Sequence, residues 1–329
     1  MIVAKDAPAV HSDPILCDFD LPLQAVFHPL GFPVEVATNS HDVLLAAKDS
    51  WGLSQLVFPE VPVQISFGVT QDEAQNCPPA PVCRGRRNLI SLVSDEQNFG
   101  VCDLRSGFAF SWVTEATVRN RAYFRYHFLE SMALIMLMSR SLTPIHAACV
   151  AFNGQGILLC GESGAGKSSL AFACARKGWT FIADDASSLV RNRSNRVVVG
   201  NPHQMRFRES AIEIFPDLEY EQVTPRVNGE MAIELATSAF PEIVTAPQTP
   251  VDYIVFLNRR NSGPTTFTGF SREKAVRWFE QVVCYGDKED RDAQKASLCN
   301  LLTAEIFELA YSNLDAAVNC LESMTRRGF

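Results

Sequence analysis

The sequence predicts an α/β fold with α+β character, in which a mixed β-sheet carries a phosphate-binding loop and a smaller β-rich domain precedes it. Two observations carry this prediction. Asn153-Gly154 lies between two apolar runs, 146–152 and 156–160, and this dipeptide is a strong hairpin signal. The strand that leads into the loop should therefore pair antiparallel with its predecessor, which makes the sheet mixed. Upstream, residues 1–115 are rich in short β-type runs.

The β-rich domain, 1–115, is predicted to hold several strands and one helix. The strands are expected at 33–37, 62–67, 88–93 and 108–113, and the helix at 40–51. Residues 69–86 contain three prolines among polar residues and are predicted as a loop. We interpret this domain as a candidate for substrate or partner recognition. A helical segment, 116–142, is predicted to link it to the second domain, 143–329.

The second domain is predicted to alternate strands and helices after the phosphate-binding loop. A second hairpin is expected at 186–200, turning around Ser194-Asn195. Further predicted elements are strands at 251–257 and 306–311 and helical stretches at 271–284, 290–302 and 313–324. The C-terminal helices suit either packing within the chain or contacts in a homo-oligomer, and both alternatives stay open.

Residues 161–168 read Gly-Glu-Ser-Gly-Ala-Gly-Lys-Ser, the complete G-x-x-x-x-G-K-[ST] pattern of a P-loop, or Walker A motif. Its glycines let the backbone turn around a phosphate, Lys167 reaches the outer phosphates, and the Ser168 hydroxyl can ligate Mg²⁺. A helix predicted at 168–177, ended by Gly178, would present its N-terminus to the phosphates. The motif predicts that a nucleoside triphosphate is bound by Gly161, Ser163, Gly164, Ala165, Gly166, Lys167, Ser168 and Ser169.

Composition and the N-terminal sequence limit the possible binding partners and the cellular compartment of the protein. A formal net charge of −8 argues against a general nucleic-acid binder, which needs excess Lys and Arg. The N-terminus lacks the apolar core of a signal peptide, and the apolar run 132–138 is too short to cross a bilayer. The ten cysteines contain no C-x-x-C pair and indicate reduced thiols. We expect a cytoplasmic protein with neither nucleic acid nor membrane as a partner.

The run 146–185 resembles the catalytic core of the HPr kinase/phosphorylase superfamily, whose fold is related to that of phosphoenolpyruvate carboxykinase. In that family a His-Gly/Ala hairpin precedes a G-[DE]-S-G-x-G-K-S loop, and a short helix ending in Arg/Lys-Gly leads to a strand closing on Ala-Asp-Asp. The matching residues here are His146, the loop 161–168, residues 176–178 and residues 183–185. The resemblance implies a P-loop kinase core of HPr kinase/PEP carboxykinase type with ATP and Mg²⁺ as cofactors.

The chain also departs from the family pattern. Bifunctional members carry Glu-x-Arg-Gly-x-Gly-Ile after this core, whereas residues 201–210 read Asn-Pro-His-Gln-Met-Arg-Phe-Arg-Glu-Ser. The resemblance therefore does not extend to phosphorolysis or to HPr as the substrate. His-Ala-Ala at 146–148 and Gly-Trp at 178–179 look more like the kinase-only relatives than like bifunctional HPr kinase/phosphorylase. The implied activity is an ATP-dependent phosphotransferase with an alcohol group as acceptor. That acceptor is open: a serine of a peptide or protein, or a small metabolite such as a sugar or free serine.

The resemblance also implies roles for individual residues. Asp184 and Ser168 would hold the metal, Asp185 would be the general base, and His146 would orient it. Arg206 and Arg208 alternate with apolar residues and could place a guanidinium on the γ-phosphate beside Lys167. Each role has a plain alternative: a solvated turn for the acidic pair, a packed strand residue for His146, and surface arginines for the other two.

Two questions stay open at this level. Adjacent strand residues point to opposite faces, so Asp184 and Asp185 share one site only if the strand ends there. Which of them is the base is therefore undecided. Other function classes also remain, namely a regulatory P-loop ATPase or a nucleotide-binding module without a phospho-acceptor. A GTPase is disfavoured, because the chain has no Asn-Lys-x-Asp motif to read the base.

Overall fold

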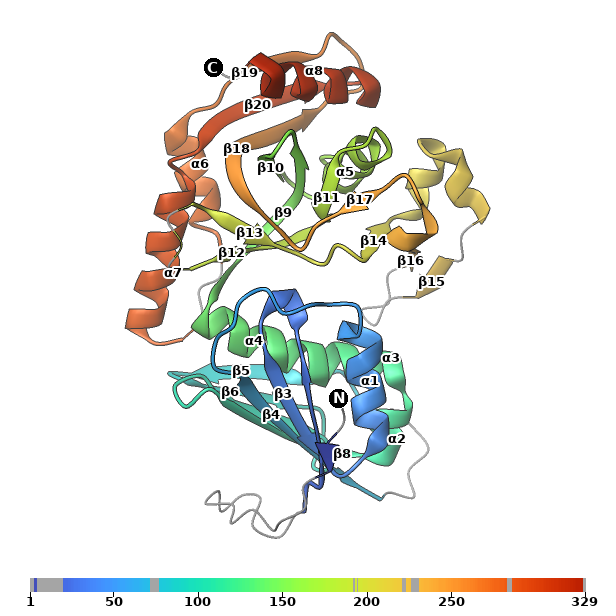
Figure 1. The fold of residues 1–329 in the computed structure, drawn as a ribbon, viewed down its shortest axis with the longest axis vertical. Coiled ribbons are helices and arrows are strands. Elements are labelled where there is room, and N and C mark those ends of the chain that lie inside the picture. Colours follow the sequence, from blue (N-terminus) through green and yellow to red (C-terminus); the bar gives the residue numbers. More distant parts are fainter. Residues whose placement is uncertain are drawn as a thin grey trace. The chain divides into compact units, whose positions relative to one another are not determined.

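The computed structural model describes residues 3–4, 20–71, 77–191, 193, 195–220, 223–225, 231–282 and 286–327. The chain forms two compact units, Met1–Arg140 with Tyr285–Arg291, and Ser141–Cys284 with Asp292–Phe329 (Figure 1). Each unit contains a mixed β-sheet, which confirms the predicted mixed α/β class. The division follows Arg140, so most of the segment predicted as a link, 116–142, is counted with the first unit.

The first unit is built on an eight-stranded sheet with helices packed on it. For example, Phe124 contacts Phe67 edge to face, with ring centroids 5.2 Å apart. The strand order is β1-β2-β3-β4-β8-β7-β6-β5. The strands are β1 (Val3–Ala4), β2 (Leu23–Phe27), β3 (Val34–Thr38), β4 (Val63–Thr70), β5 (Val82–Arg86), β6 (Leu89–Val93), β7 (Phe99–Asp103) and β8 (Phe108–Thr114). The helices are η1 (Pro29–Gly31), α1 (His41–Trp51), α2 (Glu115–Arg119), α3 (Arg121–Phe124), the π-helical η2 (Arg125–Glu130) and α4 (Ser131–Arg140).

The prediction of a loop over residues 69–86 is wrong at both ends of this range. Strand β4 continues to Thr70, and β5 occupies Val82–Arg86 at the edge of the sheet; residues 72–76 lie outside the described part. All five residues of β5 are exposed. An edge strand takes its hydrogen bonds from one neighbour and needs no apolar face of its own, so its sequence resembles that of a loop.

The second unit is built on a larger mixed sheet with the order β17-β11-β9-β12-β13-β18-β20-β19, in which β10 pairs with both β9 and β18. A separate small sheet has the order β14-β16-β15. The main strands are β9 (Leu142–Phe152), β10 (Gln155–Cys160), β11 (Thr180–Ala183), β12 (Ala186–Val190), β13 (Val197–Val199), β17 (Val244–Thr245), β18 (Gln248–Arg259), β19 (Thr266–Gly269) and β20 (Glu305–Tyr311). The small sheet consists of β14 (Gln204–Phe207), β15 (Val223–Pro225) and β16 (Met231–Ala236).

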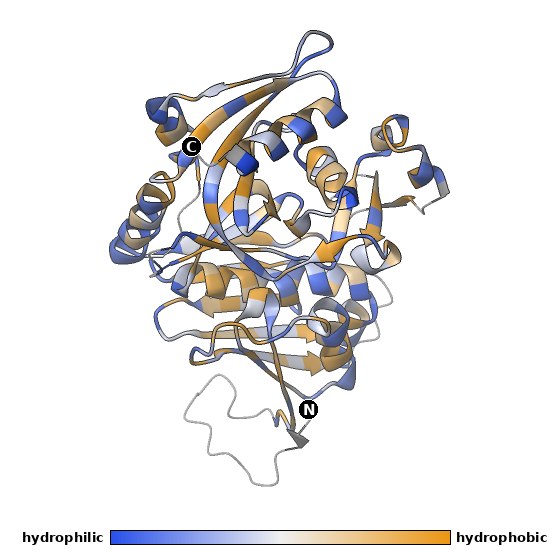
Figure 2. Cartoon of the chain, turned by 45° about the horizontal axis from the view of Figure 1, so that its top comes forward, coloured by the Kyte–Doolittle hydropathy of each residue, from blue (hydrophilic) through white to orange (hydrophobic). Residues whose placement is uncertain are grey.

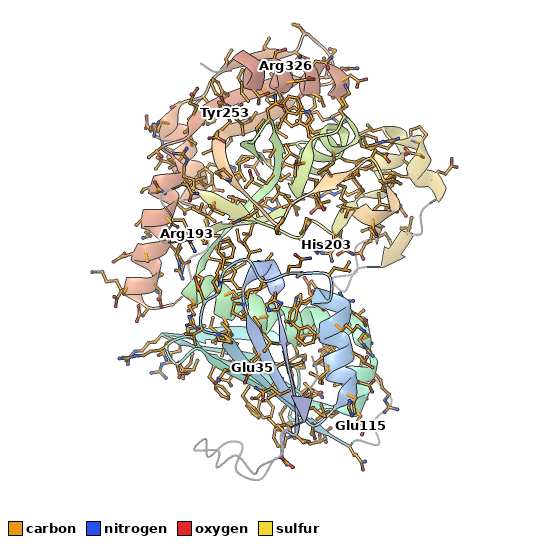
Figure 3. All side chains as sticks on the ribbon, viewed as in Figure 1. Glu35, Glu115, Arg193, His203, Tyr253 and Arg326 are labelled. Carbon is orange, nitrogen blue, oxygen red and sulfur yellow. The ribbon has the colours of Figure 1, made fainter. Side chains whose placement is uncertain are left out.

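Both predicted hairpins form. Strands β9 and β10 pair antiparallel, and the turn residues Asn153 and Gly154 have φ of 51° and 80°, as a tight hairpin turn requires. Tyr253, labelled in Figure 3, lies on β18. Its hydroxyl accepts a hydrogen bond from the amide of Gln155, at the start of β10, over 3.3 Å. Strands β12 and β13 also pair antiparallel. Ser194, expected in their turn, lies outside the described residues.

Helices cover both faces of the main sheet. Alternate residues of β10 enter two apolar clusters: Leu159 packs with Leu170 of α5 and Leu321 of α8, while Leu158 packs with Leu298 of α7 on the other face. Apolar segments accordingly concentrate on the strands and on the inner sides of the helices (Figure 2). The helices are α5 (Lys167–Arg176), α6 (Arg272–Phe279), α7 (Lys288–Leu301) and α8 (Leu314–Arg327), with the short 3-10 turns η3 (Glu209–Glu213), η4 (Pro216–Tyr220) and η5 (Thr237–Ala239). Within the described part of the chain, no helix combines the length and apolar character needed to cross a bilayer.

Candidate functional site

The P-loop and the acidic pair lie at the same edge of the main sheet. Strands β10 and β11 both run antiparallel to β9, and they are therefore parallel to each other. Strand β10 leads into the loop, and β11 ends at Ala183, directly before the two aspartates. The carboxyl ends of such strands are the usual place for ligands in open α/β sheets.

The register of β9 brings His146 to this edge as well. Ala147 pairs with Cys160, the last residue before the loop, and His146 pairs with Ala186, the residue after the acidic pair. This part of β9 therefore lies next to both the P-loop and the acidic pair. Because β11 ends at Ala183, Asp184 and Asp185 lie in a turn and are not confined to opposite faces of the sheet.

The glycines of the loop are required by its backbone and by a tyrosine behind it. Gly164 and Gly166 have φ of 86° and 91°, in the left-handed region that favours glycine. A Cβ on Gly166 would lie 2.3 Å from the Tyr311 hydroxyl. That hydroxyl donates a hydrogen bond to the carbonyl of Ala165 over 3.0 Å, so the last residue of β20 supports the loop from behind.

Lys167 is buried at the centre of the site, with a side chain that is 5% exposed. Its ammonium donates to the carbonyl oxygens of Gly161 and Glu162, over 2.9 and 3.3 Å, and to His146 Nε2 over 3.1 Å. Burial lowers the pKa of Lys167, and the nearby Asp185 carboxylate opposes that change. The three acceptors compensate for the desolvation of the ammonium.

His146 connects the lysine to the acidic pair. Its Nδ1 lies 3.3 Å from Asp185 Oδ1, and Lys167 Nζ lies 3.9 Å from the same oxygen. Because Nε2 accepts from the lysine ammonium, the ring proton is placed on Nδ1, the nitrogen that lies near Asp185. The side chains of His146 and Asp185 are 57% and 50% exposed, so a ligand can reach both.

Asp184 is half-buried and interacts mainly with backbone groups. Its Oδ2 accepts a hydrogen bond from the Arg206 N–H over 2.6 Å, and its carbonyl accepts one from the Ser168 hydroxyl over 3.4 Å. Burial raises the pKa of Asp184 to about 6, against the lowering effect of the Arg206 N–H. The two predicted metal-binding residues therefore lie next to each other.

The two predicted arginines differ in what they contact. The guanidinium of Arg206 forms an ion pair with Glu234 over 2.9 Å. Arg208 instead donates to the hydroxyl of Ser163, a P-loop residue, over 2.9 Å. Of the two, Arg208 is therefore the one whose charge is directed at the loop.

A cavity of about 1000 Å³ joins these groups. Its lining includes most of the predicted site residues: His146, Ser163, Gly164, Gly166, Lys167, Ser168, Ser169, Asp184, Asp185, Arg206 and Arg208. Gly161 and Ala165 do not line it. Sequence reasoning missed Arg259, which also lines the cavity, and Tyr311. Both end strands of the same sheet, so the position of the strand ends was the signal that could have found them.

Comparison with known proteins identifies this part of the chain. The profile of the HPr Serine kinase C-terminal domain family matches residues 138–214. Residues 138–214 belong to the HPr Serine kinase C-terminal domain family. This HPr kinase-like segment contains His146, the P-loop, the acidic pair and both predicted arginines, whereas Arg259 and Tyr311 lie outside it.

Curated relatives agree with that assignment over short stretches. HPr kinase/phosphorylase of Burkholderia lata is 40% identical over 62 residues, 18% of this chain and 19% of the relative. Putative HPr kinase/phosphorylase 2 of Oceanobacillus iheyensis is 39% identical over 66 residues, 19% and 21% of the two chains. HPr kinase/phosphorylase of Halalkalibacterium halodurans is 28% identical over 121 residues, 37% and 34% of the two chains.

The chain thus spans about a fifth to a third of the length of these relatives and is a distant homologue of HPr kinase/phosphorylase. Among solved structures, the Hpr(Ser) kinase/phosphatase from Coxiella burnetii aligns with a TM-score of 0.29 at 12% identity, covering 56% of this chain and 94% of that one. The predicted family is confirmed at the level of the HPr kinase-like segment.

Proposed function

We propose that the chain is a Mg-ATP-dependent kinase that transfers the γ-phosphoryl group to a hydroxyl acceptor, on a P-loop core of HPr kinase/PEP carboxykinase type. One observation carries the proposal. Asp185 lies within 3.3 Å of His146 Nδ1 and 3.9 Å of Lys167 Nζ, at a cavity that the P-loop also lines. A carboxylate next to the phosphate-binding lysine can act on a hydroxyl brought up to the terminal phosphate.

The P-loop would hold the polyphosphate through its N–H groups and Lys167. The lysine ammonium is directed at the carbonyl oxygens of Gly161 and Glu162 and at His146. Phosphate oxygens would replace some of these acceptors. Arg208, which donates a hydrogen bond to Ser163, would offset the negative charge that develops on the transferring phosphoryl group.

The donor set fits Mg²⁺. Ser168 and Asp184 are adjacent, and the raised pKa of Asp184 reflects a carboxylate whose burial is incompletely compensated, which a cation would correct. Mg²⁺ binds through one or two protein ligands together with phosphates and waters, and Ser168 and Asp184 would supply those protein ligands. When bound, it would neutralise charge on the phosphates.

Asp185 would act as the general base. As the acceptor oxygen bonds to the γ-phosphorus, its O–H proton passes to the Asp185 carboxylate, and the bond between the γ-phosphorus and the β,γ-bridging oxygen breaks to release ADP. The proton on His146 Nδ1 would keep the Asp185 carboxylate oriented through the 3.3 Å contact. In this scheme Asp184 binds the metal. The first unit is proposed to recognise the acceptor or a partner.

An acceptor screen tests this proposal. Mg-ATP is incubated with free serine, sugars, serine-containing peptides and HPr, and both ADP and phosphorylated product are measured. We expect ADP release that depends on one acceptor, lost in Asp185→Asn but kept in Asp315→Asn, whose carboxylate is on the surface. Hydrolysis that needs no acceptor and survives Asp185→Asn would indicate a regulatory ATPase. Binding without turnover would indicate a non-catalytic module.

A further inference from the structure

A second cavity, of about 670 Å³, lies against the first half of the P-loop. Its walls are residues 162–165 of the loop, the end of β18 with residues 258–261, and Ser312 after β20. Lys167, Asp184 and Asp185 do not line it. Arg259 lines both this cavity and the larger one, whereas Arg260 lines only this one.

The two arginines differ from the other cations of the site in having no acceptor of their own. Lys167 donates to three acceptors, and Arg206 is paired with Glu234. Across the residues that the structure describes, the guanidinium groups of Arg259 and Arg260 form no hydrogen bond and no ion pair.

Other groups of the same walls are already engaged or add little negative charge. The amide of Asn258 in the wall is engaged, since it donates to Glu308 over 2.8 Å, and Glu308 itself does not line the cavity. Glu162 supplies one carboxylate to the lining, against two guanidinium groups. A cavity with a net positive charge and unused donors favours an oxyanion.

The walls of this cavity are held in place by backbone contacts. The Arg260 N–H donates to the carbonyl of Tyr311 over 2.7 Å, and the Tyr311 hydroxyl donates to the carbonyl of Ala165 over 3.0 Å. The Ser312 hydroxyl donates to the carbonyl of Gly263 over 2.8 Å. The strand ends and the loop are therefore one connected frame, which carries the two guanidinium groups at the cavity.

We propose that Arg259 and Arg260 form a second anion-binding subsite beside the P-loop, for a phosphate or carboxylate group that is not part of the nucleotide. Its ligand is either an anionic group on the acceptor or a separate anion that alters turnover. Binding of an anion there does not depend on the proposed kinase activity, whereas its effect on transfer does.

Phosphate binding to the nucleotide-loaded protein tests the subsite. The P-loop is first filled with Mg²⁺ and a non-hydrolysable ATP analogue, and inorganic phosphate is then titrated calorimetrically at low salt. We expect saturable binding to the wild type and to the control Arg277→Gln, an exposed arginine of α6. Arg260→Gln should bind phosphate at least about tenfold more weakly, because one charged hydrogen-bonding group is lost, with unchanged affinity for the analogue. Equal phosphate affinity in Arg260→Gln and Arg277→Gln, or no phosphate binding to the nucleotide-loaded wild type, would overturn the proposal.

Turnover assays separate the two sources of the anion. If the acceptor supplies it, Arg260→Gln raises KM for acceptors that carry phosphate or carboxylate and leaves neutral acceptors unaffected. If a separate anion binds, inorganic phosphate changes turnover of a neutral acceptor in the wild type only. Identical behaviour of wild type and variant in both assays contradicts the subsite. Should the analogue fail to bind, the proposed function fails, and phosphate titration of Lys167→Ala, with and without Arg260→Gln, still tests the subsite.

Discussion

His146 illustrates how much of this site depends on one residue position. It contacts the phosphate-binding lysine through Nε2 and the proposed base through Nδ1, at 3.1 and 3.3 Å. In the proposed mechanism its role is to orient Asp185, since it need not itself accept the proton of the acceptor. The histidine should therefore matter less for turnover than Asp185.

Substitution of His146 tests this ranking. We expect His146→Ala to lower kcat by about tenfold to a hundredfold. Asp185→Asn should lower kcat more, because it removes a general base, which supplies a factor of about 10² to 10⁴. The measurement is kcat and KM for the acceptor identified by the screen. A larger loss in His146→Ala than in Asp185→Asn would reverse the assignment of the base.

Asp184 should make stability depend on pH in a distinctive direction. Its folded pKa of about 6 is above the ordinary value of 3.8, so the folded state disfavours the charged form. The resulting penalty is absent below pH 3.8 and complete above about pH 6. Its upper limit is about 3 kcal/mol, from a change of about two pKa units, and solvent at the half-buried carboxyl reduces it.

Asp184→Asn should remove this penalty because the amide is uncharged and still offers an oxygen to the Arg206 N–H. Without nucleotide, we expect the variant to be more stable than the wild type near pH 8, with the difference shrinking toward pH 4. Urea unfolding at both pH values measures it. A difference that is the same at both values, or larger near pH 4, would contradict the pKa direction.

At the scale of elements, strand β20 and the P-loop are joined through Tyr311. The hydroxyl lies where a side chain at position 166 would have to go, 2.3 Å from the ideal Cβ. Gly166→Ala should therefore weaken ATP binding and destabilise the protein, both by this clash and by the unfavourable φ of 91°.

A double-variant comparison separates these two causes. Adding Tyr311→Phe to Gly166→Ala removes the clashing hydroxyl but leaves the backbone strain. We expect part of the lost ATP affinity to return, although Tyr311→Phe alone should cost about 1 kcal/mol of stability through its lost hydrogen bond. ATP titration and thermal unfolding of all three variants measure the coupling. Additive losses would show that the tyrosine does not restrict position 166.

Local signals in the sequence predicted many of these elements and the family of the core. The hairpin at Asn153-Gly154, the P-loop and the helix that ends before Gly178 each depend on neighbouring residues, so they could be predicted. Strand β5 could not, because its edge position and not its own composition gives it partners. The pairing of His146 with Ala186 depends on register across 40 residues and likewise needed the structure.

At the scale of the whole molecule, the site combines residues that are distant in the chain. His146 and Tyr311 both contact the P-loop region, yet they are separated by most of the second unit. No local pattern connects them, and a strand end alone does not show whether its residue reaches the P-loop, so Arg259 and Tyr311 were missed. Among the residues that the structure describes, those that line the cavity at the P-loop all come from the second unit.

Nucleotide binding should therefore protect one unit selectively. With Mg-ATP at about a hundred times its Kd, ligand linkage adds about 2.7 kcal/mol to the state that binds it. Hydrogen exchange should slow most at residues 161–168 and in β11 and β12, with strands β5 to β7 of the first unit as the internal reference. Equal slowing in β5 to β7 and at the loop would contradict a site confined to the second unit.

The proposed function requires that the P-loop and the acidic pair form a single Mg-nucleotide site. The most direct test is the Mg²⁺ dependence of ATP affinity, measured by titration in the wild type and in Asp184→Asn. We predict that Mg²⁺ tightens ATP binding to the wild type, and that the variant loses at least about tenfold of this enhancement, equivalent to 1.4 kcal/mol. An identical Mg²⁺ enhancement in both proteins would contradict the account.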